Sequence, residues 1–163
     1  MRTLVDHLDF ASQIAVDGND VVFVERRKQR IGRVPKVAGP ATWIVSTGNT
    51  LEAMAVEHGD VVWCSLGTHS LLLHETDSGA LSFDDGVDIV LRDGVAYCGT
   101  WMTHDGVYRA HVEGGPAQKM CPSSTRIAAI TTDEKYVYWA ERGAMSPDGL
   151  LLAGSGRVLR APR

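Results

Sequence analysis

The sequence has few cysteines, and their arrangement is not that of a disulfide framework or a metal site. Only three occur among the 163 residues, and no two of them form a CxxC pair. Cys64 and Cys98 lie inside apolar, strand-like runs, so we expect both to be small buried hydrophobic residues. Cys121 precedes a Pro-Ser-Ser turn, where it would be a free thiol. This pattern does not require an oxidising compartment.

Long apolar runs are also missing. No stretch approaches the roughly 18 apolar residues of a membrane-spanning helix. Acidic residues interrupt the N-terminus where a signal peptide would have its apolar stretch. We therefore expect a soluble chain without a secretion signal, cytoplasmic by default and without a membrane partner, unless a leader was lost from a longer parent protein.

The chain lacks a basic surface signal. Its formal net charge is −4, and its one basic run, Arg26-Arg27-Lys28, is short. Nucleic acids and anionic membranes select a basic patch or stripe, so this charge pattern argues against both as partners. We interpret the basic run as a solvated loop.

Common catalytic patterns are absent as well. The six histidines form no His-x-His motif and no metal-binding pair four residues apart on a helix. The sequence contains neither Gly-x-Ser-x-Gly nor a phosphate-binding loop. It therefore predicts no catalytic residue, no bound metal and no cofactor, and favours a protein that is not an enzyme.

What the chain does contain is a fourfold repeat. Each copy is a short apolar strand, an Asp/Gly-type turn and a second strand of the form Val-x-aromatic. The copies begin at Ile14, Met54, Ile89 and Ile130. The valines Val21, Val61, Val95 and Val137 are spaced 40, 34 and 42 residues apart. The predicted aromatic positions are Phe23, Trp63, Tyr97 and Trp139.

Further strands follow in each copy. Third strands are predicted at 30–35, 71–76, 107–112 and 157–162, and fourth strands at 41–46, 80–83 and 117–121. Strand and turn alternate without a helical period, which is typical of a four-stranded antiparallel meander. Such a sheet cannot bury both faces alone, so we expect the copies to pack face to face. The prediction is a single all-β domain over 1–163, with repeats at about 14–47, 54–84, 89–121 and 130–163.

Motifs in several of the repeats carry a family resemblance, which covers nearly the whole chain. Asp133 is followed by Val137-Tyr138-Trp139, and Ile31-Gly32-Arg33-Val34 and Gly114-Gly115 supply the downstream elements. These motifs resemble the YWTD-like and NHL-like β-propeller repeats. The resemblance implies a propeller of four-stranded antiparallel blades. It also implies a family that includes receptor modules, bacterial surface proteins, scaffolds and a few lyases and lactonases.

The repeats are out of phase with the chain ends. The last copy stops after its third strand, whereas residues 2–5 form an orphan strand before the first copy. We predict that this N-terminal strand completes the last blade, because such a closure hides sheet edges. Three arrangements remain open: a four-bladed ring within one chain, an eight-bladed ring of a homodimer, or part of a longer chain.

Candidate ligand-binding residues lie where loops depart from the repeat, because loops on a rigid scaffold carry function. Trp101, His104 and Asp105 follow the second strand of the third copy. An exposed tryptophan beside these residues could stack on a sugar or an aromatic side chain, although it could also anchor the loop. Asp88 ends the acidic segment 84–88, which is either a solvated turn or an oxygen-rich Ca²⁺ site.

Two further candidates, Glu25 and Glu141, end the second strands of the first and last copies. The loops after the second strands should gather on one face of the ring. In the last copy this loop is long, and Leu150 to Leu152 could bury against a partner chain. We therefore predict a non-enzymatic interaction module that binds protein or glycan through these loops. The alternative is a metal-dependent hydrolase or lyase of the propeller lactonase kind.

Overall fold

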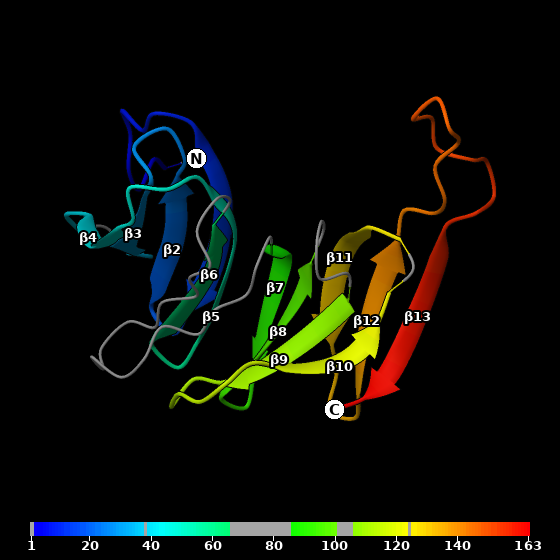
Figure 1. The fold of residues 1–163 in the computed structure, drawn as a ribbon. Coiled ribbons are helices and arrows are strands. Elements are labelled where there is room, and N and C mark those ends of the chain that lie inside the picture. Colours follow the sequence, from blue (N-terminus) through cyan, green and yellow to red (C-terminus); the bar gives the residue numbers. More distant parts are fainter. Residues whose placement is uncertain (1, 38, 66–85, 101–105, 124) are drawn as a thin grey trace.

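Short apolar runs form the β-strands of the residues that the structure describes. The computed structural model describes residues 2–37, 39–65, 86–100, 106–123 and 125–163, and these form thirteen strands (Figure 1). The prediction of an all-β chain is confirmed. Within these ranges there is no helix of the length and apolarity needed to cross a membrane.

The strands form four antiparallel sheets. The first contains β1 (Ala11–Asp17), β2 (Asp20–Glu25), β3 (Arg30–Pro35) and β4 (Thr42–Ser46). The second contains β5 (Leu51–Glu57) and β6 (Asp60–Ser65). The third contains β7 (Gly86–Arg92), β8 (Val95–Thr100), β9 (Gly106–His111) and β10 (Gln118–Pro122). The fourth contains β11 (Ile127–Thr132), β12 (Tyr136–Glu141) and β13 (Arg157–Pro162).

The repeat is visible in the strand register. The first strand of every sheet carries a bulge near its start, at Ala11/Gln13, Leu51/Ala53, Gly86/Asp88 and Ile127/Ala129. Two of the turns that join the first and second strands of a sheet have positive φ at both central residues. The φ angles are 52° at His58 and 96° at Gly59 in the second sheet, and 51° at Asp93 and 70° at Gly94 in the third. Such turns match the twist of the paired strands, which explains the Gly at the second position.

The core lies between neighbouring sheets. Within β6, Val61 and Trp63 pack toward the first sheet, while Val62 and Cys64 pack toward the third. Successive side chains of a strand point to opposite faces, so the second and third sheets, which have a neighbour on each side, are buried on both faces. Cys64 and Cys98 are both buried, as predicted from their apolar surroundings.

The predicted position of the third aromatic is wrong by one residue. Cys98 pairs with Ile89 as Trp63 pairs with Met54, so Cys98 occupies the repeated aromatic position. Tyr97 points to the other face and packs in the cluster that contains Trp139 of the fourth sheet. The error arises because the third copy places its aromatic residue one position earlier in the strand.

The N-terminal segment does not complete the fourth sheet of its own chain. Leu4, Val5 and Leu8 form no strand and pack against Val21 and Phe23 of the first sheet. The first and fourth sheets lie at opposite ends of the row (Figure 1), and the fourth sheet has three strands. The within-chain closure is therefore not formed in this structure. The strands predicted at 71–76 and 80–83 lie outside the described residues.

Candidate functional site

The end of β2 carries a buried carboxylate. Glu25 is fully buried, and its Oε1 accepts hydrogen bonds from the Asp9 backbone N–H at 2.7 Å and from Lys28 Nζ at 3.2 Å. Its Oε2 accepts a hydrogen bond from Arg30 Nε at 2.6 Å. Burial alone would raise the pKa of Glu25, but the hydrogen bonds from Asp9, Arg30 and Lys28 outweigh it, and the pKa is lowered.

Glu141 repeats this arrangement at the end of β12. Its Oε1 accepts a hydrogen bond from Ser123 Oγ at 2.7 Å, and its Oε2 accepts one from Arg157 Nε at 3.1 Å. Burial opposes ionisation here too. The hydrogen bonds from Ser123, Arg157 and Trp139 more than offset it, so the pKa of Glu141 is lowered. Glu25 and Arg30 face each other across β2 and β3 in the same register as Glu141 and Arg157 across β12 and β13.

This repeated position therefore anchors loops. In the third sheet it is occupied by Thr100, whose hydroxyl donates to the Gly106 carbonyl at 3.3 Å across the following loop. At Glu25 and Glu141, both carboxylate oxygens accept hydrogen bonds from the chain itself. A role for these two residues in ligand binding stays a prediction.

Asp88 joins two sheets. Its Oδ1 accepts a hydrogen bond from the Ile89 N–H at 3.0 Å, and its Oδ2 accepts one from the Ile130 N–H of the fourth sheet at 2.8 Å. Partial burial raises the pKa of Asp88, although the two backbone donors act in the opposite direction. No group of three His, Cys, Asp or Glu residues that could hold a metal ion occurs within the described ranges. The other members of the acidic segment, 84 and 85, lie outside those ranges.

The predicted glycan-binding group is not described by the structure. Trp101, His104 and Asp105 all fall in the range 101–105, outside the described residues. The strands on either side place their loop: it leaves β8 at Thr100 and enters β9 at Gly106. It therefore follows a second strand, as do the loops after Glu25 and Glu141.

The loop between β12 and β13 projects from the fourth sheet (Figure 1). Hydrogen bonds hold it in a hairpin-like form, from Ser146 N to Leu150 O at 2.7 Å and from Leu152 N to Ala144 O at 2.9 Å. A bridge pairs Met145 with Leu151. Its exposed apolar side chains, here called the leucine tip, are Met145, Leu150, Leu151 and Leu152. Sequence reasoning identified the leucines but not Met145, which only the hairpin pairing brings beside them.

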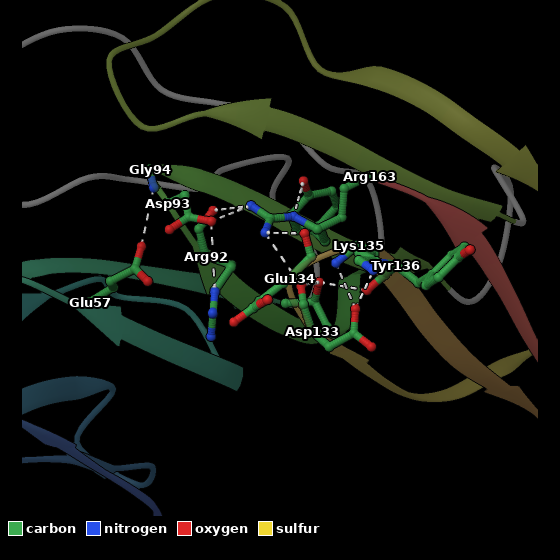
Figure 2. Close-up of polar contacts among 11 residues, drawn as sticks. Glu57, Arg92, Asp93, Gly94, Asp133, Glu134, Lys135, Tyr136 and Arg163 are labelled. Carbon is green, nitrogen blue, oxygen red and sulfur yellow. Dashed lines mark hydrogen bonds and ion pairs between the residues drawn. The ribbon is translucent and has the colours of Figure 1, made fainter.

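The opposite ends of the sheets carry a chain of contacts between turns. Asp17 Oδ2 accepts a hydrogen bond from the Gly59 N–H at 2.9 Å. Glu57 Oε2 accepts the equivalent bond from the Gly94 N–H at 3.1 Å (Figure 2). In each case the acid at the end of one sheet's first strand holds the turn of the next sheet. The turn acids thus link neighbouring sheets.

The third sheet departs from this rule, because Arg92 stands in the acid's place. Here Arg163 makes the link instead, with its Nη2 2.8 Å from Asp93 Oδ2 and 3.2 Å from the Arg92 carbonyl (Figure 2). A polar cleft of about 540 Å³ lies beside this contact, lined by Arg92, Thr132, Asp133, Glu134 and Lys135. Sequence reasoning missed this cleft. The sequence did contain a signal for it: Arg92 is basic, whereas the equivalent residues of the first two repeats, Asp17 and Glu57, are acidic.

The comparisons with known proteins give the fold. No protein family matches the sequence, and no curated protein does. The chain resembles the computationally designed Ika4 protein at TM-score 0.69 and 14% identity, covering 96% of this chain and 94% of that one. It resembles virginiamycin B lyase from Staphylococcus aureus at TM-score 0.65 and 16% identity, covering 99% of this chain and 58% of that one.

A chain of the nidogen/laminin complex matches at TM-score 0.64 and 15% identity, over 76% of this chain and 53% of that one. The chain thus spans little more than half the length of these two solved proteins. Their differing names fit a scaffold that serves unrelated functions. The four antiparallel sheets together with these likenesses establish that the chain has a β-propeller-like fold.

Proposed function

We propose that this chain is a non-enzymatic interaction module that binds a protein partner through the loops after its second strands, with the leucine tip as the main contact. The observation that carries the proposal is the tip itself. Leu150 is 70% exposed, and Met145, Leu151 and Leu152 are exposed around it. Contiguous apolar side chains on a surface mark sites of protein interaction.

The loop that carries the tip is held in place before any partner binds. Ser155 Oγ accepts a hydrogen bond from the Ala144 N–H at 3.0 Å and donates one to the Leu152 carbonyl at 2.6 Å. Ordering a loop on binding reduces affinity, and a loop already ordered avoids most of that cost. Glu141 fixes the base of the same loop through Arg157. These contacts support a surface built for recognition.

The alternative of a metal-dependent hydrolase or lyase has less support. Such an enzyme needs carboxylates whose oxygens are free to bind a metal ion or move a proton. Those of Glu25 and Glu141 are already hydrogen-bonded within the chain, and those of Asp88 accept two backbone N–H groups. The likeness to a lyase concerns the fold alone. We expect the same unfolding temperature with Ca²⁺ and with EDTA; a rise of several degrees with Ca²⁺ would favour the enzyme.

A glycan remains the second kind of partner predicted from the sequence, through Trp101, His104 and Asp105. A glycan array probed with the wild-type chain and with Trp101→Ala tests it. If the wild type binds glycans and Trp101→Ala does not, the binding site lies in this loop and not at the leucine tip.

The protein-binding proposal is tested by quantitative capture from a lysate of the source cells. The variant changes Leu150, Leu151 and Leu152 together to Ser, and the control changes the exposed Val37 to Ser. We expect at least a tenfold loss of specific partner proteins in the variant and no loss in the control. Equal capture by wild type, variant and control, with all three folded, would contradict the proposal.

A further inference from the structure

The first sheet exposes residues whose counterparts in the other sheets are buried. Ile14 pairs with Phe23 across β1 and β2, in the same register as Met54 with Trp63 in the second sheet. Ile14 is 74% exposed, whereas Met54 is 9% exposed because the first sheet covers it. The outer face of the first sheet, here called the leading face, therefore has the side chains of a sheet junction. It carries Ile14, Val21, Phe23 and Val34.

The junctions inside the chain show what a leading face needs. Over Val61 and Trp63 of the second sheet lie Val22 and Val24 of β2, together with Ile44 and Val45 of β4. The third and fourth sheets repeat this, since Met120 and Cys121 of β10 pack in the cluster that holds Val137 and Trp139. A leading face is thus covered jointly by the second strand and the fourth strand of the preceding sheet.

The N-terminal segment supplies part of that cover. Leu4 and Val5 pack on Val21 and Phe23, just as Ile44 and Val45 pack on Val61 and Trp63. Leu4 and Val5 thus contact the leading face as the fourth strand of a preceding sheet would. Beside them a cavity of about 410 Å³ lies between the segment and β1. This is the space that the inner strands of that preceding sheet would fill.

The fourth sheet offers the missing complement. In the part of the chain that the structure describes it has three strands, and β13 pairs only with β12. Val158 of β13 is the counterpart of Ile31 of β3. Val158 pairs with Ala140 of β12 in the same register in which Ile31 pairs with Val24 of β2. Ile31 is fully buried against the second sheet, whereas Val158 is 80% exposed. We call this surface the trailing face; it carries Thr131, Tyr138, Ala140 and Val158.

Polar groups of the trailing face also match those of an internal junction. Arg33 Nη2 donates to the Gly59 carbonyl in the turn of the next sheet, at 3.3 Å. Arg160 stands at the position of Arg33 in β13 and stacks over Tyr136 at 4.4 Å. Asp133 stands where Asp17 holds the next turn; in the single chain its Oδ1 accepts the Lys135 and Tyr136 N–H groups and its Oδ2 accepts the Tyr138 hydroxyl. In both cases the next turn would be the one around Asn19, the counterpart of Gly59.

We propose that the trailing face of one copy packs on the leading face of a second copy, and the reverse, so that two chains close a ring of eight sheets. Residues 2–5 of each chain then pair with β13 of the other and complete its fourth sheet. Two such head-to-tail junctions close by twofold symmetry and leave no face open. This inference is independent of the leucine tip.

The test is the solution mass measured by light scattering after gel filtration, at micromolar concentrations. We expect twice the 17.7 kDa chain mass for the wild type. Ile14→Glu and Val158→Glu place a charge in the junction from opposite sides, and each should reduce the mass to that of one chain. His111→Glu, at an exposed position of β9 in the third sheet, is the control and should keep the doubled mass. Circular dichroism checks that each variant is folded.

The measured masses distinguish the two-chain ring from the other arrangements. A wild type with the mass of one chain would overturn the proposal and favour a ring within one chain or a parent protein that supplies further sheets. Species larger than two chains would overturn the closed ring, because an unclosed head-to-tail contact grows into a filament. A doubled mass that survives both Ile14→Glu and Val158→Glu would place the dimer contact elsewhere. Loss of partner capture by the leucine-tip variant leaves this result unaffected.

Discussion

Asp88 of the third sheet accepts, through Oδ2, a hydrogen bond of 2.8 Å from the backbone N–H of Ile130 in the fourth sheet. The same carboxylate accepts the N–H of Ile89 through its other oxygen. Asp88 sits directly after the bulge of β7, so the extra residue turns its side chain toward the neighbouring sheet. A residue proposed from sequence as a calcium ligand thus links two sheets.

Asp88→Ala should destabilise the chain by about 1–3 kcal/mol, because it leaves partly buried N–H groups without an acceptor. The free energy of unfolding in urea measures this. Asp148→Ala, at an exposed position in the loop before β13, serves as the control. Equal unfolding midpoints for the two variants would show that the bond between the sheets contributes nothing.

The buried glutamates predict how stability depends on pH. The pKa values of Glu25 and Glu141 are lowered from 4.5, so their ionised forms stabilise the folded state above that pH. This contribution is lost as the pH falls below about 4.5 through the lower pKa values of the folded state. Urea unfolding between pH 7 and pH 3 should therefore show stability that falls on acidification.

The double variant Glu25→Gln, Glu141→Gln removes both titrating groups. It should be less stable than the wild type at pH 7 and should lose less stability between pH 5 and pH 3. Asp88 acts in the opposite direction, since its pKa is raised, and is unchanged in this comparison. An acid dependence identical to that of the wild type would assign the effect to other carboxylates.

Arg163 should stabilise the junction of the third and fourth sheets. It contacts Asp93 Oδ2 at 2.8 Å, and its Nε donates to the Tyr97 hydroxyl at 3.3 Å. We expect Arg163→Ala to cost about 1 kcal/mol, because the arginine is largely buried although Asp93 is exposed. Hydrogen exchange should rise in β8 and β12 and stay unchanged in β2. A uniform change across all sheets would contradict this local role.

The thiols should differ in reactivity. The Sγ atoms of Cys64 and Cys98 are 3.4 Å apart and buried, and the contact with Cys98 together with burial raises the pKa of Cys64. Cys121 is only partly buried. A thiol reagent should therefore modify Cys121 first in the folded chain, since thiolates react and buried thiols do not. Rapid modification of a Cys121→Ser variant would show that the pair between the sheets opens readily.

The strands and the repeat could be predicted from sequence because turn residues and β-branched runs are local signals. Which face a residue takes depends on register, and this is why Tyr97 was placed one position wrong. The hydrogen-bond partners of Glu25 could not be predicted, because they depend on how the chain folds. One is the backbone N–H of Asp9, and another is Arg30 on the next strand. The N-terminal strand was expected beside β13, whereas within one chain it lies on the first sheet.

The proposed ring places the turn of Asp133 in one chain against the turn of Asn19 in another. Inside the chain, Asp17 reaches the Gly59 N–H at 2.9 Å, so the two backbones are close enough for a short thiol crosslinker to span. Asn19→Cys and Asp133→Cys are made separately in a Cys121→Ser background, mixed, and treated with a short bismaleimide. We expect linked dimers in the mixture and almost none with either variant alone. The absence of linked dimers in the mixture would contradict the proposed ring.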